Sequence, residues 1–575
     1  MAIMNPKTAL EHEKITSFGG ICDHAGLTSE GASDMRNFRI LSDGSLEKRC
    51  GFFTRYLFGA SIRGLWEGTV SGETYLFVVA GNQIYRKSRT DGYPTSVYTL
   101  PTAEGNVNFA FYRENLYLFD GKTVLIFSPS IQSFSVAEGY TPLYGKNWHP
   151  TQLGEIHEPL NLLQNSIRIH YLNTNGSTVF NLPFTSQKIT SMKAGGSYTN
   201  LYSFTPGTSS FSIPTSLAGV GSVEVTVTLD ALFSERSYVV QASNPSVFRT
   251  PHHESLLTFG GGGGYTVYRT APVSDEMLDE CRITCAGADP LYFPKGNPFA
   301  VGSSLHPIRA LCQLDDQMLV FNDENIWAIR YLNDLEDDAE ILLLRSALGC
   351  ASENGVLIFG EHPIAVSDGG VVQLTIRPSD PNFCDTSILS RKIERRLSKE
   401  FLNSAILFWH RSKHQLWVRS TSDSDGLVWI FDPERDLWFC FDGIRANRFF
   451  EMEGKLGFAT DDGEICFFEE DLDSDDGKAF TAYYQSHHLA FSNPEFSKRS
   501  VRFSLCSVNN GGALSTEIET ERGKKQFEIR SERGGIPLFF DRRLAMGRFR
   551  FLRFRLSSAN VARCKIYSVS IAANN

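Results

Sequence analysis

The sequence lacks an excess of positive charge and any long hydrophobic run. Lys and Arg number 55 against 65 Asp and Glu, which gives a formal net charge of −10 at pH 7. Broad nucleic-acid affinity depends on a basic surface, so this balance argues against a general nucleic-acid-binding protein. No run of about 18 apolar residues occurs, and the first residues lack the apolar core of a secretory signal. We therefore expect no membrane span and no signal peptide.

Cysteine is sparse, odd in number and scattered, with 11 among 575 residues. The single close pair, Cys281 and Cys285, has no matching second pair, which a structural zinc site would require. Small secreted domains held by disulfides use cysteine much more densely. We therefore expect reduced, mostly buried thiols in a chain that folds in a cytosol.

Motifs of catalytic and cofactor sites are also missing. No Gly-x-Ser-x-Gly elbow occurs, and a strand-like segment follows the glycine run 260–264 instead of the Lys-Ser/Thr of a phosphate loop. The run 252–254 (His-His-Glu) lacks the helical spacing of zinc hydrolases. The alternating aspartates at 471–475 begin like a calcium loop, but the Gly and Glu that complete such a loop are replaced. We predict no enzyme activity, no cofactor, no metal site, and a solvated acidic linker at 469–477.

What the chain does contain is a repeated pair of short strands. Each copy has an apolar-aromatic strand, a turn with Gly, Asp or Asn, and a second such strand. The copies occupy 73–85, 114–127, 316–329, 354–366, 414–431 and 454–468. Their spacing, mostly about 40 residues, is typical of one four-stranded propeller blade. With 48 Gly, 43 Phe and almost no helical periodicity between copies, the sequence predicts an all-β fold built around a β-propeller.

Changes in composition divide the chain into five units. A stretch richer in Ser, Thr and Val and without Trp predicts a β-sandwich inserted between two blades, because loops tolerate insertions well. Alternating strands after the acidic run predict a second sandwich at the C-terminal end. The predicted units are an N-terminal segment with a hairpin that turns at Ser42-Asp-Gly44 (1–55), the first blades (56–158), the inserted β-sandwich (159–255), the remaining blades (256–470) and the C-terminal β-sandwich (478–575).

One strand-like segment of the last unit is strongly basic. Residues 542–565 contain eight basic residues and no acidic one. Alternation with Phe puts Arg and Phe on opposite faces of a strand, and Leu552 shifts the phase, which implies a bulge or a change of face. Two interpretations remain open: a solvated face over a Phe core, or a docking face for an acidic neighbour such as another copy of the chain. The arginines in question are Arg548, Arg550, Arg553 and Arg555.

Several segments resemble the propeller proteins of phage tails. Phe18-Gly-Gly20, followed by Asp34-Met-Arg-Asn-Phe-Arg-Ile-Leu-Ser-Asp-Gly-Ser-Leu-Glu-Lys-Arg-Cys-Gly51, is similar to their opening motif. In that motif an Asn-Phe/Val-x-Ile strand turns at a Gly and exits as Leu-x-Lys-Arg-x-Gly. The segments 62–85 and 308–327 resemble their blades, and 480–499 resembles their closing domain. The family comprises the tail nozzle, tail tubular protein B and DNA-stabilisation proteins of short-tailed bacteriophages.

The resemblance implies a structural role in a virion and no catalytic residues. Members form a six-fold ring below the portal and adaptor, extend the channel through which the genome leaves, and in several cases retain the packaged DNA until ejection. The implied partners are further copies of the chain, the adaptor–portal complex, and tail fibres or tail-tip proteins, while DNA passes through the lumen without specific binding. The implied location is the tail of a virion assembled in the host cytoplasm.

Two other functions remain open from the sequence. One is a receptor-binding or baseplate propeller protein at a phage tail tip, which would bind a cell-surface glycan. The other is a propeller enzyme that degrades polysaccharide, although no carboxylate pair among the 65 acidic residues stands out as its catalytic pair.

Overall fold

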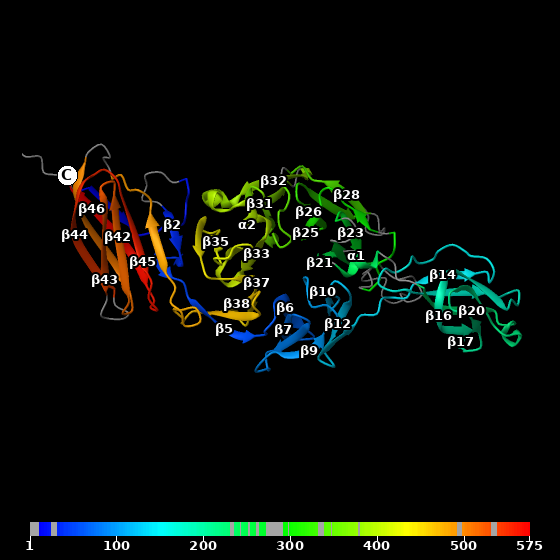
Figure 1. The fold of residues 1–575 in the computed structure, drawn as a ribbon. Helices are drawn as coiled ribbons and strands as arrows, with labels where there is room; N and C mark the ends of the chain where they lie inside the picture. The colour runs from blue at the N-terminus through cyan, green and yellow to red at the C-terminus, as the bar shows by residue number, and fades with distance from the viewer. Residues whose placement is uncertain are drawn as a thin grey trace, which may run out of the picture.

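The computed structural model describes residues 11–24, 31–230, 235–241, 243–250, 254–259, 264–271, 291–296, 298–331, 339–346, 348–377, 380–491, 497–530 and 537–574. Almost every regular element in these ranges is a β-strand. Figure 1 shows three units in a row: a two-sheet unit at one end, a ring of small sheets in the middle, and a third unit at the other end. The predicted all-β fold, a β-propeller interrupted by an insertion and followed by a sandwich, is confirmed.

Seven antiparallel sheets of four strands form the middle unit in the described ranges. In order they are β6 (Ile62–Val70), β7 (Glu73–Ala80), β8 (Gln83–Ser88), β9 (Thr95–Thr99); β10 (Asn108–Tyr112), β11 (Asn115–Phe119), β12 (Val124–Ser128), β13 (Ser133–Val136); β21 (Ser243–Arg249), β22 (Glu254–Phe259), β23 (Thr266–Arg269), β24 (Phe299–Ala300); β25 (Ile308–Leu314), β26 (Gln317–Asn322), β27 (Ile326–Tyr331), β28 (Ala339–Leu343); β29 (Val356–Phe359), β30 (His362–Ser367), β31 (Gly370–Arg377), β32 (Asp380–Ile388); β33 (Ala405–His410), β34 (Gln415–Ser420), β35 (Val428–Asp432), β36 (Leu437–Phe441); and β37 (Ala446–Met452), β38 (Lys455–Thr460), β39 (Glu464–Glu469) with β5 (Gly51–Leu57).

The seven sheets close into a ring. The first strands of successive sheets contact one another in the order β6, β10, β21, β25, β29, β33 and β37, and β37 contacts β6 again. The seventh sheet takes its outer strand, β5, from the start of the chain, where Glu469 pairs with Gly51. The propeller therefore has seven blades, and its closure joins segments about 400 residues apart.

Local turn chemistry explains why each repeat forms a hairpin. Gly81, between β7 and β8, and Gly454, between β37 and β38, have φ angles of 54° and 76°. Such left-handed conformations cost glycine little, because it has no Cβ. Between the turns, apolar side chains pack against the neighbouring blade, as where the Trp417 ring lies 5.6 Å from Phe449 and 5.8 Å from Phe468.

The inserted unit is one sheet that bends around a single core. Strand β16 pairs with β19 near Val179 and with β20 near Ala194, so its two halves belong to different parts of the sheet. The rings of Phe180 and Phe211 stack at 5.0 Å in the core between them. Its strands are β14 (Leu143–Trp148), β15 (Ser166–Leu172), β16 (Val179–Ala194), β17 (Ser197–Tyr198), β18 (Ser203–Phe204), β19 (Thr208–Ser212) and β20 (Ser222–Leu229), with a 3-10 turn at Thr215–Leu217.

This unit begins and ends earlier in the chain than the predicted range 159–255. The unit begins with β14 at Leu143, while β21 and β22, from Ser243 onward, belong to the third blade. Helix α1 (Arg236–Val240) contacts β22. Composition marked the Ser- and Thr-rich stretch, which runs on into the third blade, and it did not detect the first strand, which carries Trp148.

The two-sheet unit is built from both ends of the chain, whereas the sequence predicted 478–575 alone. One sheet contains β3 (Phe38–Ile40), β4 (Leu46–Lys48), β46 (Lys565–Asn574), β41 (Lys498–Val508) and β44 (Leu538–Phe549), with β1 (Glu11–Ile15) paired to β46. The other contains β2 (Ala32–Arg36), β40 (Ala482–Ser486), β45 (Leu552–Ser558), β42 (Ala513–Thr520) and β43 (Gly523–Arg530). We refer to this unit as the sandwich.

The predicted N-terminal hairpin forms, and it forms inside the sandwich. Phe38 pairs with Lys48 and Ile40 with Leu46, around a turn in which Gly44 has a φ of 77°. The preceding residues contact the propeller, where the Ile21 amide donates to the Trp438 carbonyl at 2.7 Å. The short helical segments Leu389–Arg396 and α2 (Lys399–Asn403) connect the fifth blade to the sixth, and Arg411–Lys413 lies in the turn between β33 and β34.

Candidate functional site

The four predicted docking arginines lie on two different sheets. Arg548 is near the end of β44, Arg550 is in the link that follows, and Arg553 and Arg555 are in β45. The chain passes from one sheet to the other at this link, which gives a physical cause for the phase shift at Leu552. The structure therefore divides the four side chains into two pairs.

Arg553 and Arg555 are held within their own sheet. Arg553 forms an ion pair with Glu519 of the neighbouring strand β42, and this hydrogen bond lowers the pKa of the Glu519 carboxyl. The guanidinium of Arg555 lies 3.8 Å from the centre of the Tyr483 ring on β40. Both arginines are half-buried, so their surroundings indicate a role in the sheet. The alternating carboxylates of β42 are the sequence signal that could have predicted an arginine paired within the sheet.

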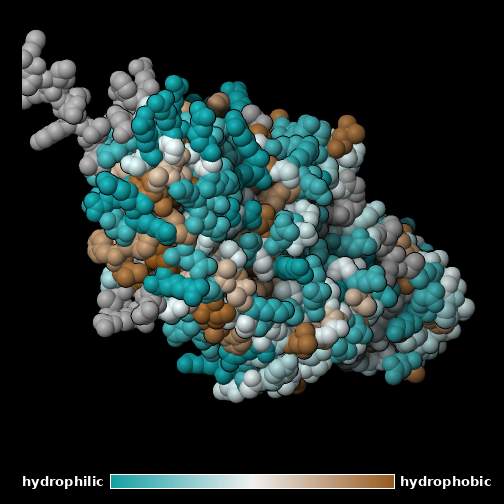
Figure 2. Space-filling view, turned by 60° about the vertical axis from the view of Figure 1, so that its left-hand side comes forward, coloured by the Kyte–Doolittle hydropathy of each residue, from teal (hydrophilic) through white to brown (hydrophobic). Residues whose placement is uncertain are grey.

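Arg548 and Arg550 are exposed, and neither side chain has a hydrogen bond or ion pair in the described part of the chain. They adjoin β44, the last strand of its sheet in the described residues, which pairs only with β41. On this strand Phe539 is 81% exposed, and Arg542 and Arg543 are also exposed. We call Phe539, Arg542, Arg543, Arg548 and Arg550 the basic edge. In Figure 2 hydrophilic side chains cover most of the face brought forward, with hydrophobic groups between them.

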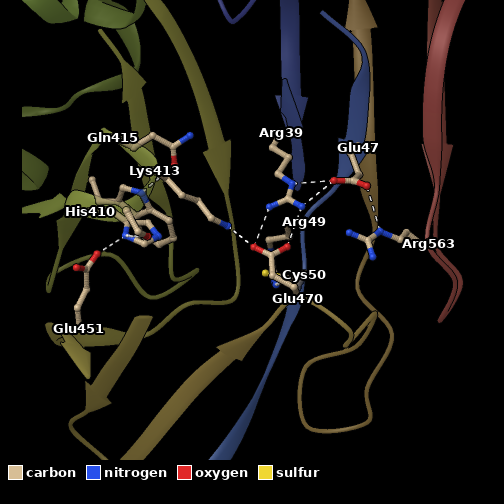
Figure 3. A network of polar contacts seen from close by, with 12 residues as sticks. Arg39, Glu47, Arg49, Cys50, His410, Lys413, Gln415, Glu451, Glu470 and Arg563 are labelled. Carbon is tan, nitrogen blue, oxygen red and sulfur yellow. Dashed lines mark hydrogen bonds and ion pairs between the residues drawn. The ribbon is translucent and has the colours of Figure 1, made fainter. Parts of the chain in front are cut away.

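A charged joint connects the sandwich to the propeller. Arg39 on β3 bridges two carboxylates, Glu47 at 2.7 Å and Glu470 at 2.9 Å (Figure 3). Lys413, from the propeller, pairs with the same Glu470, and Arg563 pairs with Glu47 at 3.1 Å. The acidic segment at 469–477 is therefore an ion-paired connection, and the prediction of a solvated linker was wrong. Composition gave its charge but could not show the cations that face it.

Arg49 is the most buried charge of this joint, with 1% of its side chain exposed. Its guanidinium binds both carboxylate oxygens of Asp475, at 2.9 and 2.6 Å, and its Nε donates to Asn37 Oδ1 at 2.9 Å. The group also lies 3.8 Å from the centre of the Phe480 ring. Asp476 accepts from the Thr54 amide and hydroxyl at 2.6 and 2.8 Å. These carboxylates are thus bound by protein donors, and the described residues contain no group of His, Cys, Asp and Glu that could hold a metal ion.

The joint predicts a pH-dependent contribution to stability. Burial raises the pKa of Glu470, but hydrogen bonds and charges from Arg39 and Lys413 outweigh it and lower the pKa from 4.5 to about 2. The folded state therefore favours the ionised carboxyl, so this contribution is complete above pH 4.5 and is lost as the pH falls toward 2. Glu470→Gln should lower the melting midpoint at pH 7, with the difference shrinking over that window.

Solvent exposure of the Glu470 side chain limits how much Glu470→Gln changes the stability. The Glu470 side chain is 52% exposed, so solvent screening limits the change to about 1 kcal/mol or less. Melting curves of both proteins from pH 7 to 2 provide the measurement, with Glu361→Gln on an exposed turn of the fifth blade as the control. A constant difference between Glu470→Gln and the parent across this range would contradict the assignment.

A pocket of about 250 Å³ lies beside the joint. Its floor is apolar and includes Trp417, Phe441 and Phe468, while Arg39 and Glu470 are among its charged wall residues. His410 lines it as well, hydrogen-bonded to Glu451; burial lowers the His410 pKa although this carboxylate opposes the shift. Cys50 also lines it, and burial raises the pKa of its thiol. A protonated thiol is a weak nucleophile, so the Cys50 thiol is not activated for attack.

Several residues considered from the sequence lie outside the described ranges. They are Cys281 and Cys285, the glycine run except Gly264, and the two histidines at 252 and 253. The nine described cysteines are unpaired, and seven of them are buried. No helix in the described part of the chain is both long enough and apolar enough to cross a membrane.

Comparisons with known proteins give only distant matches. No family model and no curated protein matches the chain. A crystal structure of BBS1N in complex with ARL6DN is 10% identical with a TM-score of 0.34, over 74% of this chain and 98% of that chain. A functionally unknown protein from Desulfotomaculum acetoxidans DSM 771 is 9% identical, with a TM-score of 0.36 over 74% and 96% of the two chains. The AfRom2 CNH domain is 8% identical, with a TM-score of 0.34 over 73% and 97%. The propeller assignment stands on the seven sheets themselves.

Proposed function

We propose that the protein is a virion structural protein that forms the ring-shaped nozzle of a phage tail. In this role it continues the DNA channel below the portal and adaptor and holds the packaged genome until ejection. The observation that carries the proposal is the opening motif, because the residues that resemble the phage family are those that build the joint. Asn37, Arg39 and Arg49 lie in that motif and bind residues across the joint, and Glu47 of the same motif pairs with Arg39.

A rigid joint suits a channel that contains DNA under pressure. Ion pairs and hydrogen bonds fix the sandwich to the propeller, and strand pairing within the sandwich joins both ends of the chain. The formal net charge of −10 also suits a lumen that must release a polyanion, because like charges repel.

The basic edge offers a surface for contact between subunits. An open edge strand is a template for further pairing, and natural proteins restrict this pairing with charge. Arg542, Arg543 and Arg548 on the open strand disfavour a basic partner strand and favour an acidic one. An acidic segment of the next copy in the ring fits this requirement, since acidic residues exceed basic ones in the chain.

Cryo-EM of the assembled particle tests the proposed function. Six copies around an open axial channel below a portal are the expected result. Three copies at a tail tip, or no copy on the tail axis, would overturn the nozzle and favour a receptor-binding protein.

Reversing charge on the basic edge is expected to prevent ring assembly. In Arg548→Glu with Arg550→Glu, the two exposed arginines without partners become carboxylates that repel an acidic neighbour. Neither side chain supports the fold. The melting midpoint of the monomer should therefore be almost unchanged, and its free energy of unfolding should stay within about 0.5 kcal/mol of the parent value. Incorporation into particles, measured by cryo-EM occupancy, should fall strongly. The matched control is Arg89→Glu with Lys122→Glu, two exposed cations on the first blades; normal incorporation of the edge variant would reject the interface.

A further inference from the structure

A polar cavity lies on the propeller axis. It has a volume of about 610 Å³, and it is lined by the inner strands of the first, fourth, sixth and seventh blades and by the loops that lead into the second and fifth. Only the axis of a propeller is bordered by that many blades at once. A second hollow of about 290 Å³ shares Glu353, Asn354, Ile406 and Arg448 with the first, so the two adjoin along the inner strands. We call the combined space the axial cavity.

One arginine that lines the axial cavity already uses its hydrogen-bond donors within the protein. Arg63 donates to the carbonyls of Gly81, Thr102, Glu104 and Gly105 at 2.6–2.9 Å. A guanidinium has five N–H donors, and this set leaves little for another molecule. Arg63 therefore serves to fasten the loop between the first two blades.

Two other arginines that line the axial cavity have N–H donors that no described residue accepts. Arg309, on β25, makes no hydrogen bond or ion pair with any described residue, and its Nε is buried. Arg448, on β37, donates to the Asn447 carbonyl at 3.1 Å, its one hydrogen bond in the described residues. Burial lowers the pKa of Arg448 although the charges of Asp461 and Glu353 oppose the shift. Leaving such donors unused is costly, so a ligand that accepts from them would bind favourably.

Acceptors lie in the same cavity. Glu353 and Asp461 line it, and Asp461 is held in place by a 2.8 Å hydrogen bond from the Asn447 side chain. Amides and hydroxyls such as Asn403 and Thr421 complete the wall. A purely anionic ligand would be repelled by the two carboxylates, and a cation would be repelled by the guanidinium groups. A ligand whose hydroxyls both donate and accept satisfies both sets.

We propose that the axial cavity binds a carbohydrate of one to a few sugar units. Arg309 and Arg448 donate to its oxygens, and Glu353 and Asp461 accept from its hydroxyls. The volume lies within the ordinary range of small-molecule sites. The sugar is either a free saccharide or the end of a longer glycan, and both present the same hydroxyls. This site goes beyond the proposed tail function and does not depend on it.

Ligand-observed NMR and calorimetry on the intact chain test the proposal. The probes are maltotriose, tri-N-acetylchitotriose and trigalacturonate, each with its monosaccharide, alongside inorganic phosphate and a glutamate-rich peptide. At least one saccharide should bind the parent protein. Preference for a trisaccharide over its monosaccharide would point to a glycan end, and equal binding would point to a free sugar. Absence of binding by every saccharide, or tighter binding of phosphate or the peptide, would overturn the site.

Arginine variants test whether the saccharide binds in the axial cavity. Arg309→Gln with Arg448→Gln should weaken saccharide binding about tenfold or more, the effect of losing charged hydrogen bonds. Arg377→Gln, on an exposed part of the fifth blade, is the control. If the double variant does not fold, Arg309→Gln alone keeps the test decisive, because Arg309 makes no hydrogen bond or ion pair with a described residue. Unchanged affinity in a folded Arg309 variant would reject the assignment, whatever symmetry the particle shows.

Discussion

Replacing Gly51 with valine is expected to open the seventh blade. Gly51 begins β5, and its amide donates to the Leu472 carbonyl at 2.6 Å. A Cβ at this position would lie 1.9 Å from the Ser474 carbonyl oxygen, which is backbone and cannot move aside. Valine favours strands, so local propensity would not explain a loss. We expect a cost of about 3 kcal/mol or more, because the closing strand must separate from β39.

Calorimetry and limited proteolysis measure this effect. The melting midpoint should fall by several degrees, and residues 51–57 should become accessible to protease. Midpoints are compared in place of a single unfolding free energy, since a chain with several units need not unfold in one step. Gly92→Val is the matched control, because Gly92 is exposed and a Cβ there meets nothing within 4 Å. Equal midpoints for the two variants would show that β5 does not hold the ring closed.

Replacing Arg49 with leucine should destabilise the joint by about 3–5 kcal/mol, the usual cost of removing one partner of a buried ion pair. Asp475 would lose two hydrogen bonds, Asn37 would lose one, and the Asp442 carbonyl would lose a donor at 3.1 Å. Leucine fills part of the volume, so the loss reports mainly on charge and hydrogen bonding. The expected observation is a lower midpoint with early proteolytic cleavage near residue 475.

A double-mutant cycle separates the ion pair from the rest of the site. Asp475→Asn alone should also be destabilising, and the double variant should cost less than the sum of the single ones, because neither partner is then left charged and unpaired. Arg377→Leu, which breaks an ion pair whose side chains are 49% and 48% exposed, should lower the melting midpoint much less than Arg49→Leu. If the Arg49 and Arg377 variants melt alike, the buried pair does not stabilise the joint.

The sequence was sufficient for the features that depend on neighbouring residues. The hairpin around Gly44 and the strand pairs of the blades carry their own turn residues and alternation, so both could be predicted. The closure by β5 and the pairing of β1 with β46 could not, because strand alternation does not identify a partner hundreds of residues away. The prediction of a free acidic linker failed for the same reason.

The candidate sites divide in a similar way. The exposure of Arg548 and Arg550 agrees with an alternating strand, but the ion pair of Arg553 depends on which strand lies beside it. The axial cavity was missed because Arg309 and Arg448 are separated along the chain and meet only when the ring closes. Short polar runs before inner strands, such as 352–354 and 403–404, are the one local signal for it.

Pairing of β1 with β46, in which His12 lies opposite Ala572, also constrains when the molecule can finish folding on the ribosome. At ordinary rates of translation, roughly half a minute to two minutes separate the synthesis of these two strands. Until β46, β40 and β39 are synthesised, the early strands β1, β2 and β5 respectively lack these partners. A nascent chain therefore exposes incomplete sheet edges until its last strand emerges. The complete sandwich therefore exists only after β46 has been synthesised, however early the propeller strands form.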